Sequence, residues 1–163
     1  MNSRLPALAV RYWSEYLEKI ERATAPLDEA SLWWRANERS NSIGNLLLHL
    51  EGNLSQWVLH GLLGEPFERH RSQEFAAAGG LGRGALVERL ARVVERCRAG
   101  VRRLDEGTLA HVRHIQTYDV DGYQALFHAV EHMAYHTGQI VLLAKALAPP
   151  GTEIDFYPQH RGE

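Results

Sequence analysis

Hydrophobic side chains recur at intervals of three and four residues along four long stretches of this chain of 163 residues. That spacing places them on one face of an α-helix, because the helix makes one turn in about 3.6 residues. In the first stretch the repeat runs through Leu5, Leu8, Tyr12, Tyr16 and Ile20. The four predicted helices cover approximately residues 3–23, 41–63, 85–104 and 123–148. Helices of this length and patterning predict an all-α fold, a four-helix bundle that residues 1–163 form as a single domain.

The second predicted helix has a clear start and an unusual interior. Ser40 or Asn41 is a suitable N-cap, and Gly64 ends the helix. Gly44 and Gly52 lie inside it at a cost in helix stability, which indicates close approach of a neighbouring segment. The segments between the helices are predicted as a loop, a glycine-rich linker and a partly extended segment, at residues 27–39, 79–84 and 105–122.

Charge and cysteine content exclude several classes of protein. Lys and Arg total 18 against 20 Asp and Glu, which gives no electrostatic reason to expect nucleic acid or an anionic membrane as a partner. Cys97 is the only cysteine, so an intrachain disulfide and a multi-cysteine zinc site are both excluded, and a buried small side chain is expected there. The N-terminus does not resemble a secretory signal, and no apolar run has membrane-spanning length, so a cytoplasmic location is expected.

The histidines carry the strongest functional signal. His128, His132 and His136 are each four residues apart and form a row along the last helix. Two imidazoles at this spacing can bind one ion, and His49 in the apolar middle of the second helix is the natural third ligand. A hydrogen-bonded histidine core without metal is the alternative. Burial of three imidazoles is costly without a metal or well-placed hydrogen bonds.

Two stretches, SIGNLLLHLEGNLSQWV at 42–58 and LFHAVEHMAYHTGQIVLLAK at 126–145, resemble the signature helices of the DinB/YfiT-like superfamily. Within it the chain looks closest to a subgroup of small bacterial proteins of unknown function. The resemblance covers nearly the whole chain and implies a bundle with a three-histidine site for a divalent metal, commonly in a homodimer. On this resemblance, the family's ligands fall on His49, His132 and His136.

Residues one turn from the proposed ligands are expected to orient them, since ligating histidines usually need a supporting partner. These residues are Asn45, Asn53, His128 and Gln139. Each amide has an alternative role facing solvent or backbone, and His128 is either a supporting residue or a spare ligand. Glu131 faces away from the histidine row, so it is not assigned as a general base. The remaining histidines are predicted on the surface or in loops, at His60, His70, His111, His114 and His160.

Three neutral imidazoles leave a divalent ion with open positions, an arrangement that favours catalysis over a closed structural site. Such an ion activates a water for hydrolysis or presents a thiolate to an electrophile. The resemblance implies the same two activities, a transferase that uses a low-molecular-weight thiol or a metal-dependent hydrolase. The alternative is a non-catalytic, stress-associated homodimer whose metal is structural. Zinc and nickel are the expected metals, and imidazole also binds iron, manganese and copper. The sequence does not identify the catalytic residues or the substrate.

Overall fold

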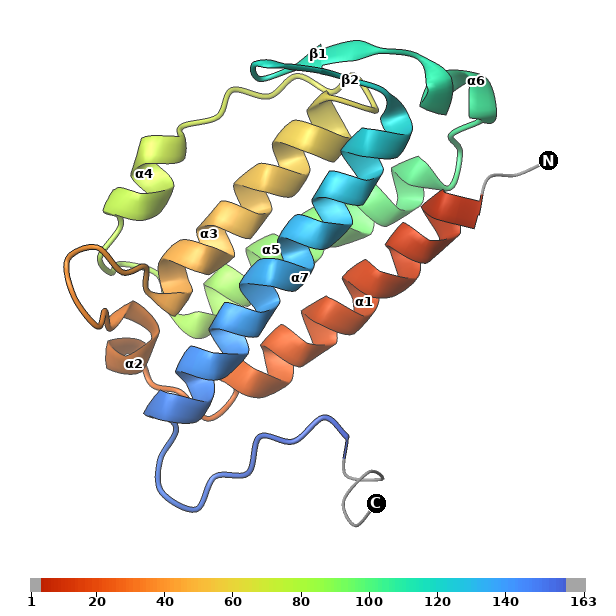
Figure 1. Ribbon diagram of the computed structural model, residues 1–163. Coiled ribbons are helices and arrows are strands. Elements are labelled where there is room, and N and C mark those ends of the chain that lie inside the picture. The colour runs from red at the N-terminus through yellow and green to blue at the C-terminus, as the bar shows by residue number, and fades with distance from the viewer. Residues whose placement is uncertain (1–3, 158–163) are drawn as a thin grey trace.

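Four long helices form the body of the protein in the computed structural model, which describes residues 4–157 (Figure 1). They are α1 (Arg4–Thr24), α3 (Ile43–Leu54), α5 (Arg83–Val101) and α7 (Gly122–Leu147). Helix α1 packs against α7 and α5, and α3 packs against α5 and α7. The predicted all-α four-helix bundle is therefore confirmed. Two details of the predictions, the helix start at Ser3 and the loop position of His160, lie outside the described residues.

Short elements fill the connections between the long helices. They are the π-helical turn η1 (Ser55–His60), α2 (Glu29–Trp33), α4 (Arg71–Ala76), α6 (Glu106–Ala110), β1 (Arg113–Ile115) and β2 (Tyr118–Val120). The prediction of an unstructured loop at residues 27–39 was wrong in part, because Asp28 caps a short helix there through the Ser31 amide. The extended character predicted within residues 105–122 is confirmed, since β1 and β2 form an antiparallel hairpin that pairs Arg113 with Val120.

The two helices that carry the histidines begin with capping boxes. The Ser42 hydroxyl accepts a hydrogen bond from the Asn45 backbone, and the Asn45 side chain accepts one from the Ser42 backbone. Asp121 and Gln124 form the same reciprocal pair at the start of α7. The predicted N-cap of the second helix at Ser40 or Asn41 was therefore wrong by one or two residues. That helix also does not continue to residue 63, because its last turn widens into η1 and ends at His60.

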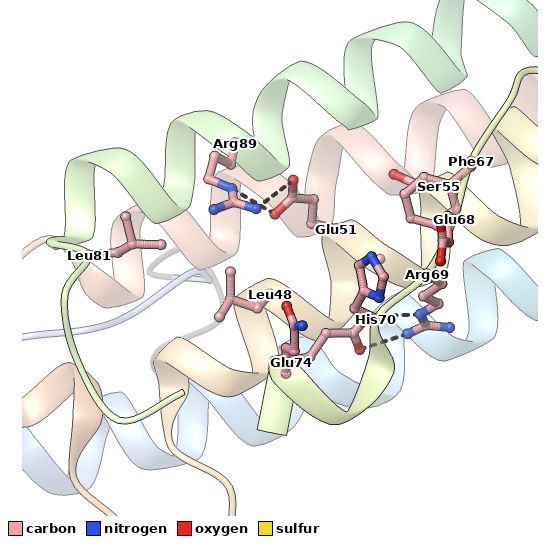
Figure 2. A pocket seen from close by; sticks show the side chains of 12 residues that line it. Leu48, Glu51, Ser55, Phe67, Glu68, Arg69, His70, Glu74, Leu81 and Arg89 are labelled. Atoms are coloured by element: carbon pink, nitrogen blue, oxygen red, sulfur yellow. Dashed lines mark hydrogen bonds and ion pairs between the residues drawn. The ribbon is translucent and has the colours of Figure 1, made fainter. Parts of the chain in front are cut away.

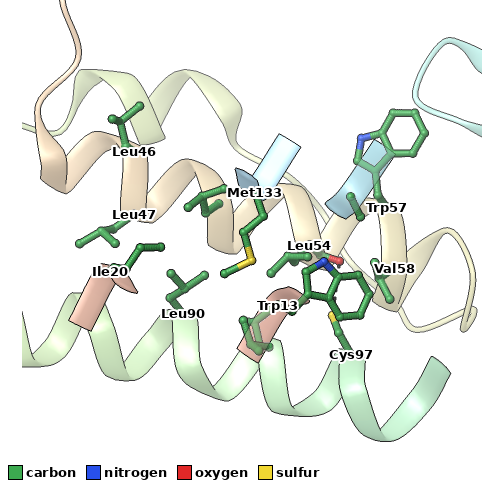
Figure 3. Close-up of a cluster of buried hydrophobic side chains, with 14 of the residues drawn as sticks. Trp13, Ile20, Leu46, Leu47, Leu54, Trp57, Val58, Leu90, Cys97 and Met133 are labelled. Carbon is green, nitrogen blue, oxygen red and sulfur yellow. Dashed lines mark hydrogen bonds between the residues drawn. The ribbon is translucent and has the colours of Figure 1, made fainter. Parts of the chain in front are cut away.

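Side chains from all four long helices meet in one hydrophobic core. Trp13 and Ile20 of α1, Leu90 of α5 and Met133 of α7 are fully buried in it (Figure 3). Gly44 of α3 packs directly against the Trp33 ring, where a Cβ atom would lie 2.7 Å from the ring. This confirms the predicted close approach of a neighbour at Gly44. None of the helices in residues 4–157 combines the length and the apolar character needed to cross a lipid bilayer.

Candidate metal centre

Three histidines from two adjacent helices meet inside the bundle. His49 projects from the middle of α3, and His132 and His136 project from successive turns of α7. One ring nitrogen from each histidine belongs to this cluster, and the three nitrogens all lie within 4.8 Å of one another. His49 is buried, while His132 and His136 are partly buried. The structure thus brings together the three residues that the sequence indicated as ligands.

The spacing of the imidazoles suits a shared metal ion. The Nε2 atoms of His49 and His132 are 3.1 Å apart. A tetrahedral zinc ion with nitrogens at about 2.0–2.1 Å holds two ligand atoms roughly 3.3 Å apart, so the observed separation is close to that of two ligands on one ion. The centroid of the His136 ring lies 5.0 Å from the centroid of the His49 ring and 4.6 Å from that of the His132 ring. All three rings therefore surround the same small volume.

Hydrogen bonds on the outer side of two rings fix the nitrogen that faces this volume. His49 Nδ1 lies 2.8 Å from Glu74 Oε2, and His136 Nδ1 lies 2.7 Å from Gln139 Oε1. Both partners are oxygen acceptors, so each Nδ1–H donates and each Nε2 keeps its lone pair. Arg69 Nη2 also lies 3.2 Å from His49 Nδ1, but the shorter contact with the carboxylate decides the position of the proton. Two of the three rings are thus held as the tautomer that binds a metal through Nε2.

Burial keeps the imidazoles of α7 neutral. It lowers the pKa of His132 to about 3, and the neighbouring imidazoles of His136, His49 and His128 add to the effect. Burial likewise lowers the pKa of His136, although the hydrogen bond to Gln139 opposes the change. The Nδ1 atom of His132 is buried and has no hydrogen-bond partner among the described residues. Neutral imidazole is the form that ligates metals, so the donor set fits a divalent transition-metal ion.

Glu74 and Arg69 were not predicted as site residues, and they support His49 from outside the two histidine helices. Arg69 donates to Glu74 through Nε at 2.7 Å and Nη2 at 2.9 Å, as Figure 2 shows. Both side chains are largely buried, with exposed fractions of 7% for Arg69 and 11% for Glu74. Burial raises the pKa of Glu74, but the hydrogen bonds and charges of His49 and Arg69 outweigh it and leave the pKa below its ordinary value. Glu74 is therefore an ionised acceptor for the His49 proton.

A glycine of α3 makes room for this ion pair. A Cβ atom at Gly52, three residues after His49, would collide with the Glu74 carboxylate and would lie 3.1 Å from Arg69 Nε. The close approach predicted at Gly52 is therefore confirmed, and the neighbour is the segment that contains α4. This glycine was the one sequence signal for the missing partner, because it lies one turn from the buried histidine. It could not identify which distant residue makes the contact.

The other predicted supporting residues have different surroundings. Of the two roles left open for Asn45, the structure shows the contact with backbone. Its amide hydrogen-bonds to Ser42 and to the backbone carbonyls of Glu74 and Ala77, and among the described residues it does not orient an imidazole. It holds α4 against α3 and so acts on the site through the backbone of Glu74. Asn53 Nδ2 lies 3.4 Å from His128 Nε2, and neither residue is a member of the three-histidine cluster.

A cleft of about 450 Å³ opens beside the histidine cluster. It is lined by His49, Asn53, Trp57, Arg69, Arg71, Gln116, Tyr118, Val120, Gln124, His128 and His132. The β-hairpin and η1 supply its aromatic wall, since the rings of Trp57 and Tyr118 have centroids 6.1 Å apart. A second cavity of about 320 Å³, drawn in Figure 2, shares Arg69 with the cleft and also includes Glu51 and Glu74. The histidines therefore border a space large enough for a small organic molecule.

Cys97 is buried in α5, and burial raises the pKa of its thiol. A buried thiol of high pKa is a poor nucleophile, in agreement with the predicted packing role. Glu131 is exposed on α7, as expected from its different face.

The fold is shared with proteins of known structure. Three crystal structures share the fold at 15–17% sequence identity: a conserved protein from Enterococcus faecalis and DinB-like proteins from Bacillus cereus and Bacillus subtilis. The TM-scores are 0.73, 0.67 and 0.68, and the alignments cover 90%, 89% and 92% of this chain and 98%, 95% and 97% of the others. The fold is thus that of the DinB-like proteins, and the predicted resemblance is confirmed.

The family itself follows from the sequence. Residues 7–153 match the model of DUF1572, described as a protein of unknown function, and the chain belongs to that family. No protein of curated function matches the sequence significantly. The family and the structural neighbours therefore identify the fold, and the chemistry has to be argued from the site.

Proposed function

We propose that the protein binds one divalent transition-metal ion through His49, His132 and His136. The observation that carries the proposal is the convergence of the three imidazoles while Glu74 and Gln139 occupy the outer nitrogens of two of them. Three nitrogen ligands leave the ion with open positions. Zinc or nickel suits such a site best, and iron, manganese and copper also bind imidazole.

We further propose that the ion serves a metal-dependent enzyme, either a transferase that uses a low-molecular-weight thiol or a hydrolase. When bound, the ion supplies Lewis-acid chemistry that lowers the pKa of a thiol or a water. The chain's own residues hold the proton on His49 Nδ1 through Glu74 and on His136 Nδ1 through Gln139. The adjoining cleft supports a catalytic role over a structural metal, because a structural site needs no space for a substrate.

Elemental analysis of untagged protein tests the metal site. Wild-type protein is expected to contain about one transition metal per chain, and the double variant H132A/H136A is expected to contain none. His128→Ala is the matched control, because His128 lies on the same helix one turn from His132 but outside the cluster. Metal in the control and its absence in the double variant would support the proposal. Absence of metal in all three proteins, with none taken up on titration, would reject it.

We also propose a homodimer through the outer face of α7. Phe127, Tyr135 and Leu142 of this helix are large hydrophobic residues with exposed fractions of 66%, 61% and 70%, and Leu8 of α1 is 44% exposed. Exposed apolar residues on neighbouring helices are typical of a protein interface. Light scattering is expected to give twice the chain mass for wild type and a lower mass for F127E/L142E. A monomeric wild-type protein at micromolar concentration would reject the dimer.

A further inference from the structure

We propose that the cleft beside the three-histidine cluster binds a small organic oxyanion. Its charged group pairs with Arg71, and its apolar part lies against Trp57 and Tyr118. The inference deepens the proposed function, because it names the substrate class of the same site. It rests on the residues of the cleft itself, so it can be tested on protein without metal.

Arg71 is a cation available to a ligand. It lines the cleft, is exposed, and forms no ion pair within residues 4–157. Its guanidinium carbon lies 4.9 Å from the centroid of the Phe75 ring. The Phe75 ring in turn lies 4.8 Å from that of His49, so this contact holds the guanidinium near the histidine cluster. Arg69, by contrast, already uses Nε and Nη2 on Glu74.

The charge balance of the cleft favours an anion. The described residues that line it include two arginines and no aspartate or glutamate. Glu74 compensates Arg69, which leaves the charge of Arg71 without a partner. A divalent ion on the three histidines would add further positive charge. A guanidinium also matches the geometry of a carboxylate or phosphate, because it donates two parallel hydrogen bonds.

Another part of the cleft lining is apolar and aromatic. The π-helical turn η1 places Trp57 against His128 with ring centroids 4.1 Å apart, and the β-hairpin places Tyr118 beside Trp57. Trp57 is nearly buried whereas Tyr118 is 57% exposed, so the aromatic lining combines a buried ring with an exposed one. Asn53 contributes a buried Oδ1 that has no hydrogen-bond partner among the described residues. A ligand with an apolar body would fit the aromatic part of the cleft.

Ligand-observed NMR titrations of chelator-treated protein test the inference with three probes of one shape class. They are 3-phenylpropionate, its neutral amide 3-phenylpropionamide, and phenyl phosphate. The carboxylate is expected to bind wild type at least tenfold more tightly than the amide. Arg71→Ala and Arg71→Gln are expected to remove this preference. Arg92→Ala is the matched control, since Arg92 is an exposed arginine of α5 that does not line the cleft, and it is expected to keep the preference.

Equal affinities for the carboxylate and the amide in wild type, or an undiminished preference in both Arg71 variants, would overturn the inference. Thermal melting of each variant checks that the fold is intact. Tenfold tighter binding of phenyl phosphate than of the carboxylate would assign the anion to phosphate esters, and the reverse order would assign it to carboxylates. If elemental analysis finds no metal but the preference for the carboxylate over the amide depends on Arg71, the proposed function is rejected and the inference stands. If the protein holds metal but binds the carboxylate and the amide equally, the inference is rejected and the proposed function stands.

Discussion

His136 and His49 contribute to the same cluster, but the partners of their outer nitrogens come from different levels of structure. His136 is held by Gln139, three residues later on the same helix. His49 is held by Glu74, which is 25 residues away and is itself fixed by Arg69. The first arrangement exists as soon as α7 forms, whereas the second requires α4 to dock on α3. The comparison indicates that the α3 side of the site is both the more strongly built and the more dependent on tertiary structure.

The largest difference between the two sides of the site is expected from Glu74→Ala. The change leaves the Arg69 guanidinium buried without its partner, which costs about 3–5 kcal/mol of unfolding free energy. Loss of the acceptor for the His49 proton is expected to weaken metal binding about 10–100-fold. Glu74→Gln keeps an acceptor oxygen and should fall between wild type and the alanine variant. Chemical denaturation and competition with a zinc chelator measure the two effects.

Glu51→Ala is the matched control for this prediction. Glu51 lies on the same helix as His49 and pairs with Arg89 (Figure 2), and this pair is more exposed than the pair of Arg69 and Glu74. Its loss is expected to cost at most about 1 kcal/mol and to leave metal affinity unchanged. Equal losses of metal affinity in the Glu51 and Glu74 variants would contradict the role assigned to Glu74.

A smaller effect is expected from adding one methyl group at Gly52. The Cβ atom has to displace the Glu74 carboxylate, so Gly52→Ala is expected to cost about 1–3 kcal/mol despite the better helix propensity of alanine. Gly138→Ala is the control, because a Cβ atom at this α7 position meets nothing within 4 Å. It should stabilise the protein by roughly 1 kcal/mol. A lower melting temperature for Gly52→Ala and a higher one for Gly138→Ala would support the contact between Gly52 and Glu74. A higher melting temperature for both variants would contradict it.

The smallest effect is expected from Gln139→Ala. The amide is neutral and partly exposed, and a water can replace it as acceptor for the His136 proton. Metal affinity is therefore expected to fall only a few-fold, with little change in the unfolding free energy. The same chelator competition applies to this variant. A loss as large as that of Glu74→Ala would show that the two sides of the site are equally demanding.

Much of the fold and of the cluster could be predicted from local sequence patterns. Helical periodicity located the four long helices, because the spacing of apolar residues along the chain determines which face of a helix is buried. The same periodicity placed His132 and His136 on one face of α7. The short helices at Glu29–Trp33, Arg71–Ala76 and Glu106–Ala110 were not predicted, since five or six residues are too few for a periodic signal.

The spacing of residues along the chain determines the four long helices and the side chains that each of them presents to its neighbours. The contacts of the histidine cluster with residues outside the long helices follow from the tertiary structure alone. The docking of α4 brought Glu74, Arg69 and Arg71 to His49, and the same docking turned Asn45 toward the α4 backbone in place of an imidazole. The physical reason is that helix periodicity is a property of neighbours along the chain. Hydrogen bonds and ion pairs between segments depend on packing across the whole bundle, which the spacing of residues does not encode.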